Sequence, residues 1–257
     1  IASVRRRLES YLDDETRVAL HHLAGDPSVA APLRAAVYEA LAELNDQQSL
    51  SSMIDWLADP GLTSARPALE QAIAALSGDG PPDPKQETRM IELAAQADAP
   101  DTRASFFRLM SSIGGLECLA YLKEQMLGAP EETALAAARE LAKTSQPGAI
   151  PYLLEALENS ESLGVQVLTL RGLVRLIDAA DLPPEESTPL YHRAWLAAPR
   201  LEEQRLVLTR IEALGEDALA ELPIPDKQSL DLVLARIGAW AESAQLEVLE
   251  RAGRAYP

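Results

Sequence analysis

Residues 26–41 read DPSVAAPLRAAVYEAL, and they contain the signals of a turn followed by a helix. The Asp-Pro pair at 26–27 marks the turn, because proline cannot continue a helix but suits the first turn of the next one. From Arg34 onward, most residues are alanine or other apolar residues that form or tolerate a helix. The stretch therefore predicts the second helix of a helix pair, near residues 28–44.

Similar stretches return along the chain about every 30 to 38 residues. A period of this length is typical of solenoids, in which helix pairs stack in single file. We therefore predict an all-α fold, a right-handed α-solenoid of about six to seven helix pairs. The first helices of the pairs are expected near 14–24, 47–58, 86–97, 116–127, 148–158 and 185–197. The second helices are expected near 28–44, 62–77, 101–113, 131–144, 162–177 and 200–214.

The predicted organisation is a single array over residues 1–257, with six pairs over 14–214. Residues 1–13 form an N-terminal cap with a leading helix near 3–12. Residues 215–257 form an irregular C-terminal cap, with helices near 216–222, 227–241 and 243–254. Irregular ends suit a stack, because terminal repeats must cover an apolar face that would otherwise be exposed. Residues 78–84, rich in glycine and proline, are the best candidate for a hinge.

The composition excludes some partners. Apolar residues make up 47% of the chain but aromatic residues only 4%, and the formal net charge is −17. Nucleic acids and anionic membrane surfaces are polyanions, so a chain with this charge is not expected to bind them. No apolar stretch reaches the ~18 residues that span a bilayer, so we expect no membrane insertion.

The chain offers little for catalysis or metal binding. Its only cysteine, Cys118, lies in a helical leucine pattern and is expected to be a buried apolar residue. His21 and His22 are adjacent, and neighbouring helical side chains diverge by about 100°, so they cannot easily share a metal ion. There is no nucleophile motif and no glycine-rich nucleotide motif. We expect no catalytic residues, no cofactor and no metal.

The second helices resemble those of HEAT-like repeats, including the bacterial lyase-type variety. The resemblance rests on the Asp-Pro turn, on an arginine such as Arg34 or Arg66, and on the following run of alanine and leucine. It covers about residues 14–214, and it implies the architecture more than a function.

A narrower likeness covers about 131–214 and includes residues 149–155, 168–177 and 183–186. This part looks like repeat arrays of large bacterial multidomain proteins, which are often exported and accompany carbohydrate-active or cytochrome-type modules. The likeness implies a module of a larger bacterial protein, and an exported location over a cytoplasmic one. The first residue is isoleucine, so we expect that a piece of chain precedes it.

Aligning the second helices produces a column of arginines near their starts. Such arginines are expected to tie one repeat to the next through acidic groups or backbone carbonyls. Two pairs depart from the column, with Ala134 and Gln166 in place of arginine. The residues assigned this structural role are Arg34, Arg66, Arg103 and Arg205.

A second column follows five positions later, and four consecutive pairs place arginine in it. Second helices are expected to line the concave side of a solenoid, and the planar guanidinium fork suits carboxylates and phosphates. Two interpretations remain open: the arginines bind an acidic segment or an anionic ligand, or each pairs with a glutamate or aspartate of a neighbouring repeat. The residues of this candidate stripe are Arg108, Arg139, Arg171 and Arg210.

The sequence thus favours a non-catalytic scaffold that binds a protein or peptide on its concave face. The alternatives are a helical-repeat enzyme or lyase-like protein, and an architectural spacer beside a catalytic module. A deep pocket with perturbed acids would favour the enzyme, whereas a featureless acidic surface would favour the spacer.

Overall fold

The computed structural model describes residues 13–62, 64–78, 83–240 and 242–255. These residues form α-helices and short 3-10 helices and contain no β-strand. They fall into two compact units, Ile1–Leu122 and Lys123–Pro257, and the division lies within helix α8 (Leu116–Gly128). The all-helical prediction is confirmed. The predicted leading helix at 3–12 lies outside the described residues.

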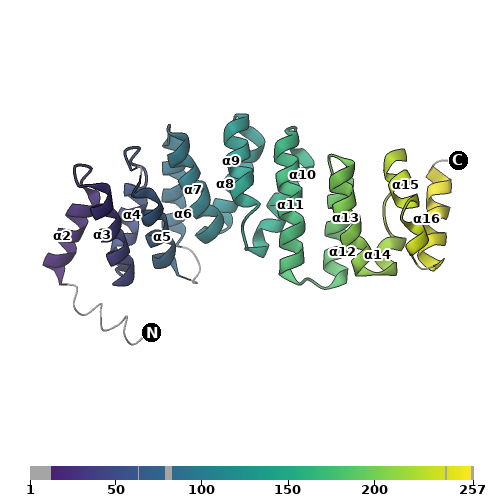
Figure 1. The fold of residues 1–257 in the computed structure, drawn as a ribbon, viewed down its shortest axis with the longest axis horizontal. Helices are drawn as coiled ribbons and strands as arrows, with labels where there is room; N and C mark the ends of the chain where they lie inside the picture. Colours follow the sequence, from purple (N-terminus) through teal and green to yellow (C-terminus); the bar gives the residue numbers. More distant parts are fainter. Residues whose placement is uncertain (1–12, 63, 79–82, 241, 256–257) are drawn as a thin grey trace. The chain divides into compact units, whose positions relative to one another are not determined.

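Unit 1 consists of helix pairs that follow one another along the chain (Figure 1). Second helices contact second helices, since α3 packs on α5 and α5 packs on α7, while the first helix α4 packs on α6. The helices are α2 (Asp14–Gly25), α3 (Ala31–Glu43), η1 (Gln47–Ser49), α4 (Leu50–Trp56), α5 (Arg66–Ser77), α6 (Pro84–Gln96), α7 (Pro100–Ile113) and the start of α8.

Unit 2 repeats this neighbour-to-neighbour packing. Helix α11 contacts both α9 and α13, α13 contacts α15, and α10 contacts α12. The helices are α9 (Glu131–Leu141), η2 (Pro147–Ala149), α10 (Ile150–Asn159), α11 (Leu163–Ala180), α12 (Pro184–Leu196), α13 (Leu201–Leu214), α14 (Glu216–Ala220), α15 (Lys227–Leu234), η3 (Ile237–Ala239) and α16 (Glu242–Ala255).

The core of each unit is mostly aliphatic, as the composition predicts, and a few aromatic side chains such as Tyr38, Phe106 and Trp195 are fully buried in it. Small residues let the helices approach closely, and the clearest case is Gly172 of α11. A Cβ atom at this position would lie 2.5 Å from the Cβ of Ala142, just after α9. Close packing of this kind leaves no room for another side chain, so α9 and α11 are in direct backbone contact here.

Most helix positions agree with the prediction, and two departures have clear local causes. Helix α5 begins at Arg66 and not near 62, because the Asp59 carboxylate accepts a hydrogen bond from the Gly61 N–H and extends the turn. The helix predicted over 227–241 is split into α15 and η3, with Gly238 in the second part. In the proposed hinge segment, Gly78 has a positive φ of 62°, and Asp83 caps α6 through the N–H of Lys85.

Candidate interaction surface

The first arginine column is built into the structure of the helix pairs. Arg66 is 7% exposed, and its guanidinium donates hydrogen bonds to the carbonyls of Leu57, Asp59 and Leu62 around the α4–α5 turn. It also donates to the Thr102 hydroxyl of α7, at 3.0 Å. One side chain thus closes its own turn and contacts the neighbouring second helix.

Other members of the column make some of the same contacts, either with a carbonyl of their own turn or with the neighbouring helix pair. Arg103 donates to the Ala97 carbonyl in the α6–α7 turn. Gln166, which replaces arginine in α11, donates to the Ser160 carbonyl in the α10–α11 turn at 2.7 Å. Arg34 is buried and lies 3.6 Å from the carboxylate of Asp59, which belongs to the next helix pair.

The structure shifts the alignment by one residue in α13. Arg205 is exposed, and the described residues offer its guanidinium no hydrogen bond or ion pair. Gln204 is the buried residue at this point, and its amide donates to the Ser229 hydroxyl of α15 at 3.0 Å. Gln204, and not Arg205, therefore makes the contact with the next second helix that the column was expected to make.

The candidate stripe is largely paired with carboxylates of neighbouring second helices. Arg108 donates two hydrogen bonds to the carboxylate of Glu70, at 2.9 and 2.7 Å. Arg171 donates to Glu203 at 3.0 Å, and Arg210 donates to Asp178 at 2.8 Å. For these three arginines, the structure contains the inter-repeat pairs that the second interpretation expects.

Arg139 differs from the other three. Its side chain is exposed on α9, and within the described part of the chain its guanidinium has no hydrogen-bond or ion-pair partner. It is therefore the stripe member with its full donor capacity available to a ligand.

Two further cations lie one helical turn beyond the stripe, and the sequence alignment did not single them out. Arg175 follows Arg171 by four residues and shares its face of α11, and Lys143 follows Arg139 by four residues in the turn after α9. Arg175 donates to the carbonyls of Ala142 and Thr144 at the end of α9. A search for cations both five and nine residues after the first arginine column would have found them. We call Arg139, Lys143, Arg171 and Arg175 the basic face.

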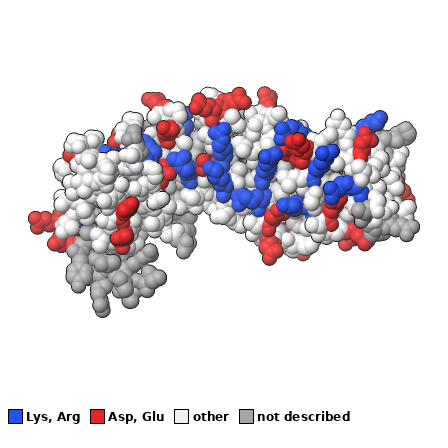
Figure 2. Space-filling model, in the orientation of Figure 1, with Lys and Arg blue, Asp and Glu red and all other residues white. Residues whose placement is uncertain are grey.

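The carboxylates near the basic face do not balance its charge. Lys143 pairs with Glu140 at 3.0 Å, and Glu203 is shared between Arg171 and Arg200. Arg175 donates to neutral carbonyls, and Arg139 has no acidic partner in the described structure. Figure 2 shows Lys and Arg side chains gathered over α9, α11 and α13. This part of unit 2 is positive, although the whole chain is strongly negative.

The pKa values of two paired carboxyls reflect their arginine neighbours. Hydrogen bonds from Arg200, with a smaller contribution from Arg171, hold the pKa of Glu203 below its usual range. In unit 1, burial alone would raise the pKa of Glu70, but hydrogen bonds from Arg108 and Ser105 outweigh it and lower the pKa. Both carboxylates are therefore firmly ionised at neutral pH.

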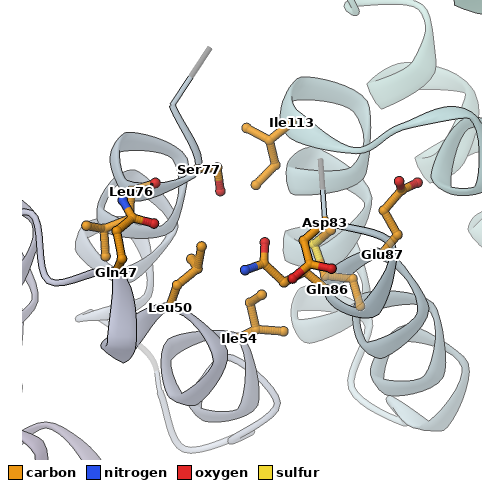
Figure 3. A pocket seen from close by; sticks show the side chains of 10 residues that line it. Gln47, Leu50, Ile54, Leu76, Ser77, Asp83, Gln86, Glu87 and Ile113 are labelled. Atoms are coloured by element: carbon orange, nitrogen blue, oxygen red, sulfur yellow. Dashed lines mark hydrogen bonds between the residues drawn. The ribbon is translucent and has the colours of Figure 1, made fainter. Parts of the chain in front are cut away.

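A cavity of about 170 Å³ in unit 1 lies between α4, α5 and α6 (Figure 3). Its polar groups already have structural roles. Gln47 donates to the Leu76 carbonyl at 2.7 Å, and Asp83 caps α6. In Figure 3 the Glu87 carboxylate points away from Gln47 and Leu50, and it accepts the N–H of Cys118 in the first turn of α8. The cavity thus brings no uncommitted pair of acids together.

Cys118 and His21, the other residues that the sequence analysis considered, lie among neighbouring groups of the fold. Cys118 is buried, and burial together with the nearby Glu87 raises the pKa of its thiol. The Nε2 atom of His21 forms a hydrogen bond of 2.5 Å with the Ser49 hydroxyl and lies 3.8 Å from the Asp46 carboxylate. Both Ser49 and Asp46 face the same ring nitrogen of His21, whereas a catalytic triad uses both nitrogens. The described residues contain no group of three or more side chains suited to a metal ion.

Comparisons with known proteins add no assignment: no family model, no curated protein and no solved structure matches this chain. Among the described helices, none combines the length and the apolar character needed to cross a membrane.

Proposed function

We propose that this chain is a non-catalytic interaction scaffold that binds an acidic segment of a protein partner on the basic face of unit 2. The observation that supports the proposal is a group of cations on neighbouring second helices of a chain whose net charge is −17. In such a chain, a positive surface that its own carboxylates do not neutralise favours an anionic partner.

We further propose that the helix pairs are HEAT-like repeats of an α-solenoid, within a larger bacterial protein. Support comes from the packing inside each unit, where second helices contact second helices in chain order. Support also comes from the column of Arg66, Arg103 and Gln166, whose side chains donate to backbone carbonyls of three of the turns within helix pairs.

The proposal can be tested with a fluorescein-labelled peptide of about twelve residues, mostly glutamate, and a glutamine peptide of the same length. Fluorescence anisotropy should detect binding of the glutamate peptide that weakens as salt is raised, because added ions screen exposed charges. The glutamine peptide should not bind.

The double variant Arg139→Glu/Lys143→Glu should weaken binding of the glutamate peptide by about tenfold or more, since two favourable charges become repulsive. Arg193→Glu is the matched control, because Arg193 is also half-exposed and pairs with Glu158, but lies on the first helix α12. Equal binding by all three proteins would refute the proposal. Arg171 is a poor choice for charge reversal, since a glutamate there would face the buried Glu203.

A further inference from the structure

We propose that a cavity between the α8–α9 turn and the α10–α11 turn binds an arginine side chain of a partner protein. This site is separate from the basic face and prefers a ligand of the opposite charge. The inference follows from a position at which α9 lacks the polar side chain that α7 and α11 carry, and from the cavity that lies at this position.

The polar side chain in question belongs to the fourth residue of the second helix. In α7 this residue is Arg103, which donates to the carbonyl of Ala97, six residues earlier. In α11 it is Gln166, which donates to the carbonyl of Ser160, also six residues earlier. Both carbonyls lie in the turn within a helix pair. The fourth residue of α9 is Ala134, whose methyl group cannot donate a hydrogen bond.

The carbonyl that lacks a donor for this reason is that of Gly128, six residues before Ala134. Gly128 is the last residue of α8, and the last carbonyls of a helix have no further turn to bond. Within the described structure, no backbone or side-chain donor bonds this carbonyl. Leu127 and Ala129, on either side of Gly128, both line the cavity. The cavity therefore adjoins a carbonyl that can accept a hydrogen bond from a ligand.

The cavity is about twice as large as its counterpart in unit 1. It has a volume of about 710 Å³ and extends from Ala134 to Ser162 and Gly164 at the start of α11. The counterpart, between the α4–α5 and α6–α7 turns, has a volume of about 360 Å³ and is lined by Arg66. The Arg66 guanidinium bonds both its own turn and the Thr102 hydroxyl of α7. Unit 1 thus shows how an arginine side chain fits between two such turns.

The rim of the cavity suits a cationic side chain with an apolar stem. Glu131 and Glu161 line it, both are exposed, and neither has an ion-pair partner in the described part of the chain. Leu127 and Leu163, which also line it, are 37% and 49% exposed. Arginine combines methylene groups that pack on leucine with five N–H donors for carboxylates and carbonyls. Lysine has three donors on a compact charge and fits this set of acceptors less well.

The test uses short peptides of glycine and alanine with one central residue, which is arginine, lysine or citrulline. Citrulline has nearly the shape of arginine but no charge. Each peptide is titrated into isotope-labelled protein, and NMR follows the amide signals of Ala129, Ser162 and Gly164. We expect the arginine peptide to shift these signals saturably and to bind at least about tenfold more tightly than the citrulline peptide, with the lysine peptide between them.

Ala134→Arg should abolish binding of the arginine peptide, because the new guanidinium occupies the cavity from within, as Arg66 does in unit 1. Ala136→Arg is the matched control, since it adds the same charge to α9 at a partly exposed position outside the cavity. The variant Glu131→Gln/Glu161→Gln changes no buried residue and should weaken binding about fivefold or more. This variant decides the test if Ala134→Arg does not fold.

Equal binding of the arginine and citrulline peptides would overturn the proposal. So would wild-type affinity for the arginine peptide in Glu131→Gln/Glu161→Gln or in a folded Ala134→Arg protein. None of these results bears on the proposed function, because no residue of the basic face lines the cavity.

Discussion

The start of α5 in unit 1 and the last turn of α9 in unit 2 each carry an arginine, and the two behave in opposite ways. Arg66 is 7% exposed and donates hydrogen bonds to three carbonyls and two hydroxyls. Arg139 is exposed and has no partner among the described residues. The two positions differ by five residues within the repeat, and five steps of about 100° turn a side chain by roughly 140° around the helix. One position therefore faces the neighbouring repeat, and the other faces solvent.

The comparison implies that arginine serves stability at the first position and recognition at the second. The largest effect on stability should come from Arg66→Ala. The variant leaves the carbonyls of Leu57, Asp59 and Leu62 without this donor in a partly buried turn, which should lower the free energy of unfolding by about 3 kcal/mol. Urea denaturation measures this change.

Gly172→Val should have the next largest effect, because the new side chain would collide with Ala142 and separate α9 from α11. Overpacking of this kind costs about 1–3 kcal/mol, which a shift of the thermal midpoint would report. Gly128→Ala is the matched control, since a Cβ atom at that glycine meets nothing within 4 Å. A Gly172→Val protein as stable as wild type would contradict the close packing of Gly172 against Ala142.

Glu203→Gln tests the paired part of the stripe and should cost about 1–2 kcal/mol at neutral pH, because two arginines lose a charged acceptor. The pKa of Glu203 is lowered in the folded protein, so its contribution is present above the unfolded pKa and is lost as pH falls through the folded value. The difference between wild type and variant should therefore shrink below about pH 4. Urea denaturation at several pH values checks this, and a difference that grows in acid would contradict it.

Arg139→Ala should have the smallest effect on stability, below about 0.5 kcal/mol, as is usual for an exposed residue without a specific contact. Urea denaturation beside Arg66→Ala makes the comparison direct. A loss as large as that of Arg66→Ala would mean that both positions serve the fold, and would remove the basis for a recognition role at Arg139.

Much of the fold could be predicted from the sequence because the turn signals are local. Proline lies in the first turn of α6, α7 and α12, and each of these helices begins within two residues of its predicted start. The sequence predicted less well which residues of α13 are buried. Arg205 and Gln204 are adjacent, and only packing against Ser229 of α15 shows which one is buried.

The candidate surface could be predicted only in part, because its charge balance depends on distant residues. The carboxylate that pairs with Arg108 is 38 residues away, and the one that pairs with Arg171 is 32 residues away. No local pattern distinguishes these glutamates from the many others of this acidic chain. The sequence therefore identified where arginines recur, while the structure identified Arg139 as the member of the candidate stripe without an acidic partner in the described residues.

The most direct measurement is an NMR titration that follows the arginine Nε–H signals while the glutamate peptide is added. The account predicts that the signals of Arg139, Arg171 and Arg175 shift together and saturate. Those of Arg193 on α12 and Arg89 in unit 1, which pair with Glu158 and Asp55, should stay in place. Equal shifts of Arg89 and Arg193, or no shift of Arg139 at peptide concentrations that saturate the protein, would contradict it.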